Sequence, residues 1–182
     1  MLRTNLGTIV IGLSSRAPCT VNSFVHLAEV GFFDNTQCQR MVTAGIYVLQ
    51  CGDPYATARK KLACSISNLS ITAMADYKFA DENLKGATYP AGRVAMANDG
   101  ARNSNGSQFF IVYKDSTSGL GPTYTPFGTV SSGLNIVRNV AHAGLTCEYV
   151  QAGGGVPREK VVINSVAIKR STISGQSGVG LN

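Results

Sequence analysis

The chain has 182 residues, of which 44% are hydrophobic and 14% are charged. This composition excludes an intrinsically disordered chain, and the length suits one domain that buries a substantial core. No apolar run reaches the roughly 20 residues of a membrane-spanning helix, so we expect no membrane segment. The N-terminal stretch contains Asn5 and Gly7 and has no clear small-residue cleavage site, which fits a first strand better than a signal peptide.

The net charge of +6, with a pI of about 9.2, raises the question of a nucleic-acid partner. The basic residues are mostly scattered, and the only cluster is Arg59-Lys60-Lys61. We therefore interpret the charge as a solvated basic surface and predict no nucleic-acid binding.

Five cysteines occur, at positions 19, 38, 51, 64 and 147. An odd number without tight spacing argues against a disulfide framework, so we expect reduced thiols and a cytoplasmic location. Only two histidines are present and there is no Cys-x-x-Cys pair, so we predict no metal site. The glycine run at 153–155 lacks the pattern of a phosphate-binding loop, and we predict no cofactor.

Taken in chain order, the hydrophobic pattern predicts many short strands and two helices. Pro18 suits the first turn of the first helix, and Gly31 suits its end. The expected strands are 8–13, 38–42, 46–51, 77–81, 93–97, 108–113, 126–130 and 160–169, and the expected helices are 18–31 and 133–143.

Two segments do not fit this regular pattern. Residues 54–78 contain no glycine, and 65–72 within them could form either an additional strand or a loop over the sheet edge. Residues 171–182 are rich in serine and glycine, and we expect a disordered tail. The predicted organisation is one domain over residues 1–170, with an atypical connection at 54–78.

The stretch from 94 to 113 organises the chain. A polar, glycine-containing loop separates a short apolar stretch from a dense run at 108–113, which reads as a strand. Because side chains alternate along a strand, Gln108 and Phe110 share one face. An amide and an aromatic ring beside an Asn/Gly loop suit a site that holds a peptide by its backbone and one apolar side chain.

The residues Met96-Ala97-Asn98, followed by Asn105-Gly106-Ser107-Gln108-Phe109-Phe110, resemble the signature of the cyclophilins, which are peptidyl-prolyl cis-trans isomerases. Three further stretches, at 33–40, 49–53 and 127–130, follow the family in the same order. The resemblance is to the compact bacterial type. It extends from about residue 2 to 169 and is interrupted between 54 and 78. It implies a mainly β fold, a closed eight-stranded antiparallel barrel capped by two α-helices, with the ligand site on its outer face.

The resemblance also implies the reaction, which is rotation about Xaa-Pro peptide bonds in support of protein folding. Arg40 occupies the family's arginine position, and its guanidinium would donate a hydrogen bond to the prolyl nitrogen of the twisted amide. The apolar pocket for proline would come from Tyr47, Val48, Phe110, Leu120 and Phe127. Gln50, Ala97, Asn98 and Gln108 would hold the backbone of the bound peptide, and Tyr124 would also belong to the substrate site.

Three positions depart from the family pattern. Gln39 and Tyr124 stand at or near positions where cyclophilins commonly carry histidine. Gly119 replaces the tryptophan through which many eukaryotic members contact cyclosporin, so we predict weak cyclosporin binding.

The leading interpretation is an isomerase that acts on proline-containing peptides and unfolded protein clients as a monomer. The alternative is a cyclophilin-fold binding module for such peptides with little or no turnover. Arg40 favours the enzyme, whereas Gln39 and the connection at 54–78 favour the binding module.

Overall fold

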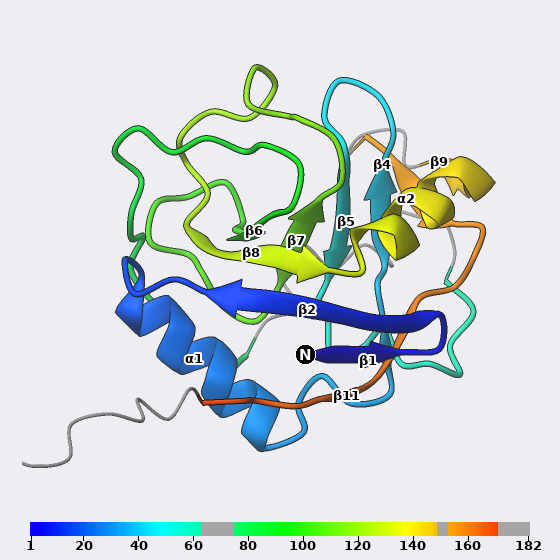
Figure 1. Cartoon of the computed structure of the whole chain (residues 1–182), viewed down its shortest axis with the longest axis horizontal. Coiled ribbons are helices and arrows are strands. Elements are labelled where there is room, and N and C mark those ends of the chain that lie inside the picture. Colours follow the sequence, from blue (N-terminus) through cyan, green and yellow to red (C-terminus); the bar gives the residue numbers. More distant parts are fainter. Residues whose placement is uncertain (63–74, 149–152, 171–182) are drawn as a thin grey trace, which may run out of the picture.

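A computed structural model describes residues 1–62, 75–148 and 153–170 (Figure 1). Within these residues the chain forms eleven short strands, all paired antiparallel, and two helices, so the expected mainly β fold is confirmed. In chain order the elements are β1 (Leu2–Thr4), β2 (Gly7–Leu13), α1 (Pro18–Glu29), β3 (Thr36–Gln37), β4 (Arg40–Val42), β5 (Val48–Cys51), β6 (Arg93–Met96), β7 (Phe109–Val112), β8 (Pro126–Ser132), α2 (Leu134–Ala143), β9 (Leu145–Glu148), β10 (Gly155–Pro157) and β11 (Val162–Val166).

The strand order explains why eleven strands are found where eight were expected. It runs β3-β11-β1-β2-β8-β6-β7-β5-β4-β10-β9. Only Cys38 and Gln39 separate β3 from β4 along the chain. When β3 and β4 are counted as one strand, the order from β11 to β5 returns to that strand and forms a ring of eight. The β9–β10 hairpin is an addition to this ring.

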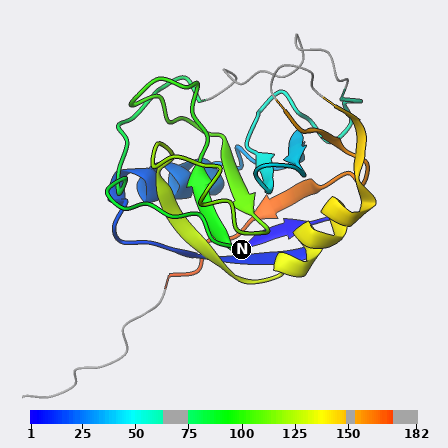
Figure 2. The ribbon, with the colours of Figure 1, turned by 90° about the horizontal axis from the view of Figure 1, so that it is seen from above.

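The two helices lie on opposite sides of the molecule and contribute to the same main core (Figure 1 and Figure 2). Phe24 of α1 is buried, and its ring centroid lies 5.2 Å from that of Phe33 and 5.4 Å from that of Phe109. Val137 and Val140 of α2 are fully buried. Both helices therefore pack one apolar face, as their sequence spacing predicts.

The N-terminus of α1 is capped from a distant part of the chain. Ala17, at the N-cap position, makes no side-chain cap. Instead, the Glu82 carboxylate accepts hydrogen bonds from the backbone N–H groups of Cys19 (3.1 Å) and Thr20 (2.8 Å). Glu82 thus connects the loop before β6 to the first turn of the helix.

The expected strand at 77–81 is wrong, since only one isolated bridge, between Phe79 and Asn105, occurs there. Side chains occupy backbone groups that a ladder would use: the Asp81 carboxylate accepts from the backbone N–H of Asn103, and the backbone N–H of Asp81 donates to Oδ1 of Asn103. The possible strand at 65–72 and the expected tail at 171–182 lie outside the described residues, and so does part of the 54–78 connection.

The expectation of reduced cysteines is also wrong. Cys38 and Cys51 form a disulfide, and Cys147 is disulfide-bonded as well. The two cysteines of the first bond are 13 positions apart, but β4 and β5 pair antiparallel and bring them together. The argument from reduced thiols for a cytoplasmic location therefore no longer holds, and the location itself stays a prediction. No helix within the described residues has the length and hydrophobicity to span a membrane.

Candidate active site

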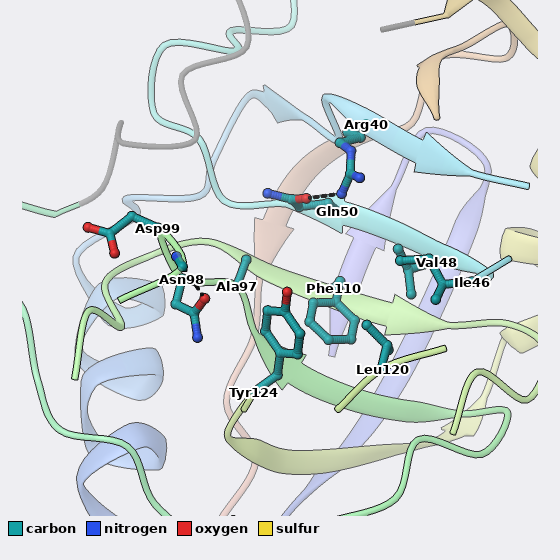
Figure 3. A pocket seen from close by; sticks show the side chains of 11 residues that line it. Arg40, Ile46, Val48, Gln50, Ala97, Asn98, Asp99, Phe110, Leu120 and Tyr124 are labelled. Carbon is teal, nitrogen blue, oxygen red and sulfur yellow. Dashed lines mark hydrogen bonds between the residues drawn. The ribbon is translucent and has the colours of Figure 1, made fainter. Parts of the chain in front are cut away.

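A pocket of about 250 Å³ opens on the face of β5 and β7 that points away from the main core (Figure 3). Its base is a second, smaller apolar cluster that includes Val48 and Phe110. The lining residues are Arg40, Ile46, Val48, Gln50, Ala97, Asn98, Asp99, Gly100, Phe110, Leu120 and Tyr124.

The side chains of β7 divide between the two clusters as the alternation predicts. Phe109 and Ile111 are buried in the main core, and Phe110 and Val112 belong to the cluster beneath the pocket. In the ladder with β5, Gln50 lies opposite Phe110. The register therefore places an amide beside an aromatic ring on one face.

One side of the pocket is polar and is dominated by Arg40 on β4. Its Nη1 donates to Oε1 of Gln50 at 3.0 Å, and its Nε donates to the carbonyl of Gly153 at 3.0 Å. Because Arg40 and Gln50 are direct cross-strand partners, the sheet register itself brings them together. Two groups among the described residues thus hold the guanidinium beside the cavity, as Figure 3 shows for the bond to Gln50.

The other side of the pocket is apolar and well braced. The Tyr124 ring meets the Phe110 ring edge-on, with centroids 5.5 Å apart, and Leu120 lies beside them. Tyr89 is fully buried behind this wall, and its hydroxyl donates to the carbonyl of Tyr124 and accepts from the N–H of the same residue. Burial raises the pKa of Tyr89, so the phenol stays protonated and keeps this donor.

The end of the pocket at Asn98 and Asp99 is tied down by side-chain hydrogen bonds. Asn98 Nδ2 donates to the carbonyl of Thr123 at 2.9 Å. The Asp99 carboxylate pairs with Lys78 at 2.7 Å. Lys78, together with hydrogen bonds from Ser104 and the backbone, holds the pKa of Asp99 well below its usual range. The pocket lining therefore includes both a carboxylate and a guanidinium.

Three of the predicted site residues do not line this pocket, as far as the described residues show. Tyr47 lines a different hollow beside Tyr113 and Lys114, and Phe127 is fully buried in the main core. Gln108 is fully buried as well, where its Oε1 accepts hydrogen bonds from Gln50 and Gln39. The remaining predicted residues, Arg40, Val48, Gln50, Ala97, Asn98, Phe110, Leu120 and Tyr124, surround one cavity.

The structure adds lining residues that the sequence analysis did not name. Ile46 lies on the same face as Val48 and Gln50, because residues two apart in an extended segment share a face. Tyr47 lies between Ile46 and Val48 in the sequence, so the alternation rule alone predicts that Ile46, and not Tyr47, lines the pocket. Asp99 and Gly100 come from the loop after β6, where no periodic signal exists. Within the described residues no group of three or more His, Cys, Asp and Glu side chains could hold a metal ion.

Comparison with known proteins identifies the family. The family model described as cyclophilin type peptidyl-prolyl cis-trans isomerase matches residues 1–168. The chain belongs to the cyclophilin family.

Curated relatives of this cyclophilin carry isomerase names. A protein of Mycobacterium tuberculosis named probable peptidyl-prolyl cis-trans isomerase B is 42% identical over 172 residues, covering 91% of this chain and 52% of the relative. The protein of that name from Mycobacterium leprae is 41% identical, covering 92% of this chain and 55% of the relative. The chain thus spans about half the length of these relatives.

The fold also agrees with a solved structure. A cyclophilin type isomerase of Cryptosporidium parvum, crystallised in the presence of the dipeptide Ala-Pro, matches with a TM-score of 0.71 and 25% sequence identity. The match covers 93% of this chain and 98% of that one. Most of the fold is therefore shared with a known member of the family.

Proposed function

We propose that this cyclophilin is a peptidyl-prolyl cis-trans isomerase that accelerates rotation about Xaa-Pro bonds. The single observation that carries the proposal is the guanidinium of Arg40, held by Gln50 and Gly153 at the edge of an apolar pocket. The names of the curated relatives and the Ala-Pro dipeptide of the Cryptosporidium structure support the same substrate class.

The mechanism makes and breaks no covalent bond. The barrier of roughly 18–20 kcal/mol comes from amide resonance, which is lost when the bond twists. Twisting localises a lone pair on the prolyl nitrogen, and Arg40 donates a hydrogen bond to that nitrogen. The guanidinium is permanently charged, so this donor needs no adjustment of its pKa. Its stabilisation is greater for the twisted amide than for either planar form, which is the condition for catalysis.

The remaining pocket residues bind and orient the peptide. The proline ring lies in the apolar part, between Phe110 and Leu120, and the peptide backbone runs beside Gln50 and the Ala97–Asn98 segment. The partners we propose are proline-containing segments of unfolded proteins, bound by a monomer.

The test is the isomerisation rate of a Xaa-Pro tetrapeptide, measured in a protease-coupled assay with the parent and Arg40→Ala. We expect the variant to lose about 100-fold in kcat/KM, the usual scale for removing one preorganised donor. Arg16→Ala, at an exposed arginine that does not line the pocket, is the matched control and should equal the parent. Equal rates for parent and Arg40→Ala would refute the role of Arg40. No acceleration by a folded parent would favour a binding module instead.

A further inference from the structure

Gln39 is a buried polar residue immediately before Arg40. Its side chain is only 2% exposed, although it belongs to neither β3 nor β4. Its Nε2 donates to Oε1 of Gln108 at 2.9 Å, within the protein interior. This is one of the positions where the chain departs from the histidine common in cyclophilins, so the family pattern assigns no role to the glutamine.

The hydrogen bond from Gln39 is the first of a directed series. Oε1 of Gln108 also accepts from Nε2 of Gln50 at 2.7 Å. The other end of that amide, Oε1 of Gln50, accepts from Arg40. Each glutamine amide has one donor end and one acceptor end, so the orientation of each amide determines which end it offers to the next.

We propose that Gln39 is a positioning residue for Arg40, because the hydrogen bond that it donates sets the direction of this amide series. The inference rests on the proposed isomerase function. Two donors, Gln39 and Gln50, converge on the Gln108 oxygen and keep it turned towards Gln50. Without Gln39, one of the two donors that the described residues offer to this oxygen is lost. A reversed Gln108 amide would face Nε2 of Gln50 with a second donor. If Gln50 reversed in response, its own NH2 would face the guanidinium.

The backbone around Gln39 limits other ways of compensating. Cys38 is tied to Cys51 by the disulfide, and Arg40 is paired with Gln50 in the β4–β5 ladder. The residues on both sides of Gln39 are therefore fixed to the same neighbouring strand. When the Gln39 side chain is changed, we therefore expect the amides of Gln108 and Gln50 to reorient while the backbone stays in place.

The test compares Gln39→Met, which has similar length but no N–H donor, with Gln39→His, which keeps a ring N–H of similar reach. In the tetrapeptide assay we expect Gln39→Met to lose about tenfold or more in kcat, because small displacements of reacting groups are costly. Its dissociation constant for the same tetrapeptide, measured by calorimetry, should change little. Gln39→His should retain the parent kcat.

A second readout is independent of activity. The Arg40 Nη1–H signal, from the group that donates to Oε1 of Gln50, should be dispersed and slow to exchange in a nitrogen-15 NMR spectrum of the parent and of Gln39→His. It should move towards the free-arginine position in Gln39→Met. If Gln39→Met does not fold, Gln39→Ser, whose hydroxyl is too short to reach Gln108, takes its place.

The outcomes separate the two proposals. An inactive parent with an ordered Arg40 signal that Gln39→Met disorders would refute the isomerase proposal and support the positioning role. An active parent matched in kcat by Gln39→Met, with an unchanged Arg40 signal, would overturn the positioning role alone. A histidine variant as slow as the methionine variant would also overturn it, since the donated hydrogen bond would then not be the property that counts.

Discussion

Gly119 lies against the loop that precedes β5. A Cβ atom at this position would lie 2.6 Å from Cγ2 of Ile46 and 2.8 Å from the carbonyl of Gly45. The loop before β5 thus packs directly on the position where many cyclophilins carry tryptophan. The glycine is required by this close approach, and a larger side chain would have to displace the loop.

We therefore predict that cyclosporin inhibits this protein poorly and that Gly119→Trp does not restore inhibition. The substitution should also lower the free energy of unfolding by about 1–3 kcal/mol, the usual cost of overpacking. The measurements are inhibition of the tetrapeptide assay at stoichiometric drug and a urea titration of both proteins. Tight inhibition of the parent would contradict the prediction.

At the scale of single elements, the contact between Glu82 and α1 connects local sequence to tertiary structure. The helix begins with proline at its first turn but has no capping side chain of its own. Glu82 supplies it, and the Thr20 hydroxyl adds a third bond at 2.8 Å. Burial alone would raise the pKa of Glu82, but the hydrogen bonds from Thr20 and Cys19 outweigh it and lower the pKa.

We predict that Glu82→Gln lowers the free energy of unfolding by about 0.5–1 kcal/mol at pH 7, because the amide lacks the negative charge and one of the two acceptor oxygens at the helix N-terminus. Because the folded-state pKa is lowered, the contribution of Glu82 is present above its unfolded pKa and is lost as the pH falls through the folded value. Urea titrations should therefore show the gap between parent and variant shrinking below about pH 4. The exposed Glu148→Gln serves as the control, and a gap independent of pH would contradict the assignment.

At the scale of the whole molecule, the decisive feature is the joint at residues 38 and 39. It connects β3, at one end of the strand order, to β4 near the other end, and so brings the curled sheet back on itself. The disulfide between Cys38 and Cys51 lies at this joint, since Cys38 is two residues before Arg40 and Cys51 directly follows Gln50. Closure of the sheet and placement of the proposed catalytic arginine therefore depend on the same few residues.

We predict that the double variant Cys38→Ala/Cys51→Ala lowers the free energy of unfolding by about 3 kcal/mol, the expected value for a closed loop of about 15 residues. Unfolding by guanidinium chloride measures this. The control is Ser15→Ala, which alters an exposed side chain outside the helices and strands and should leave the transition unchanged. An unchanged midpoint in the double variant would show that the bond does not stabilise the fold.

The sequence by itself determined the family, the mainly β class and most of the pocket. Short-range patterns carry this information: alternation in β7 predicts the face on which Phe110 lies, and the spacing within β5 places Val48 and Gln50 on one face together. The same alternation argues against Tyr47, whose neighbours on both sides line the pocket. Arg40 could be predicted as the catalytic residue because the family motif that contains it is one contiguous stretch of sequence.

Only the tertiary structure decided which distant groups meet. Cys38 and Cys51 pair because the antiparallel register of β4 and β5 joins them, which an odd count of cysteines does not reveal. Gln108 leaves the pocket surface because Gln39 and Gln50 converge on its oxygen from two other segments. Hydrogen bonds and disulfides between segments depend on register and side-chain direction in three dimensions, and no one-dimensional period encodes them.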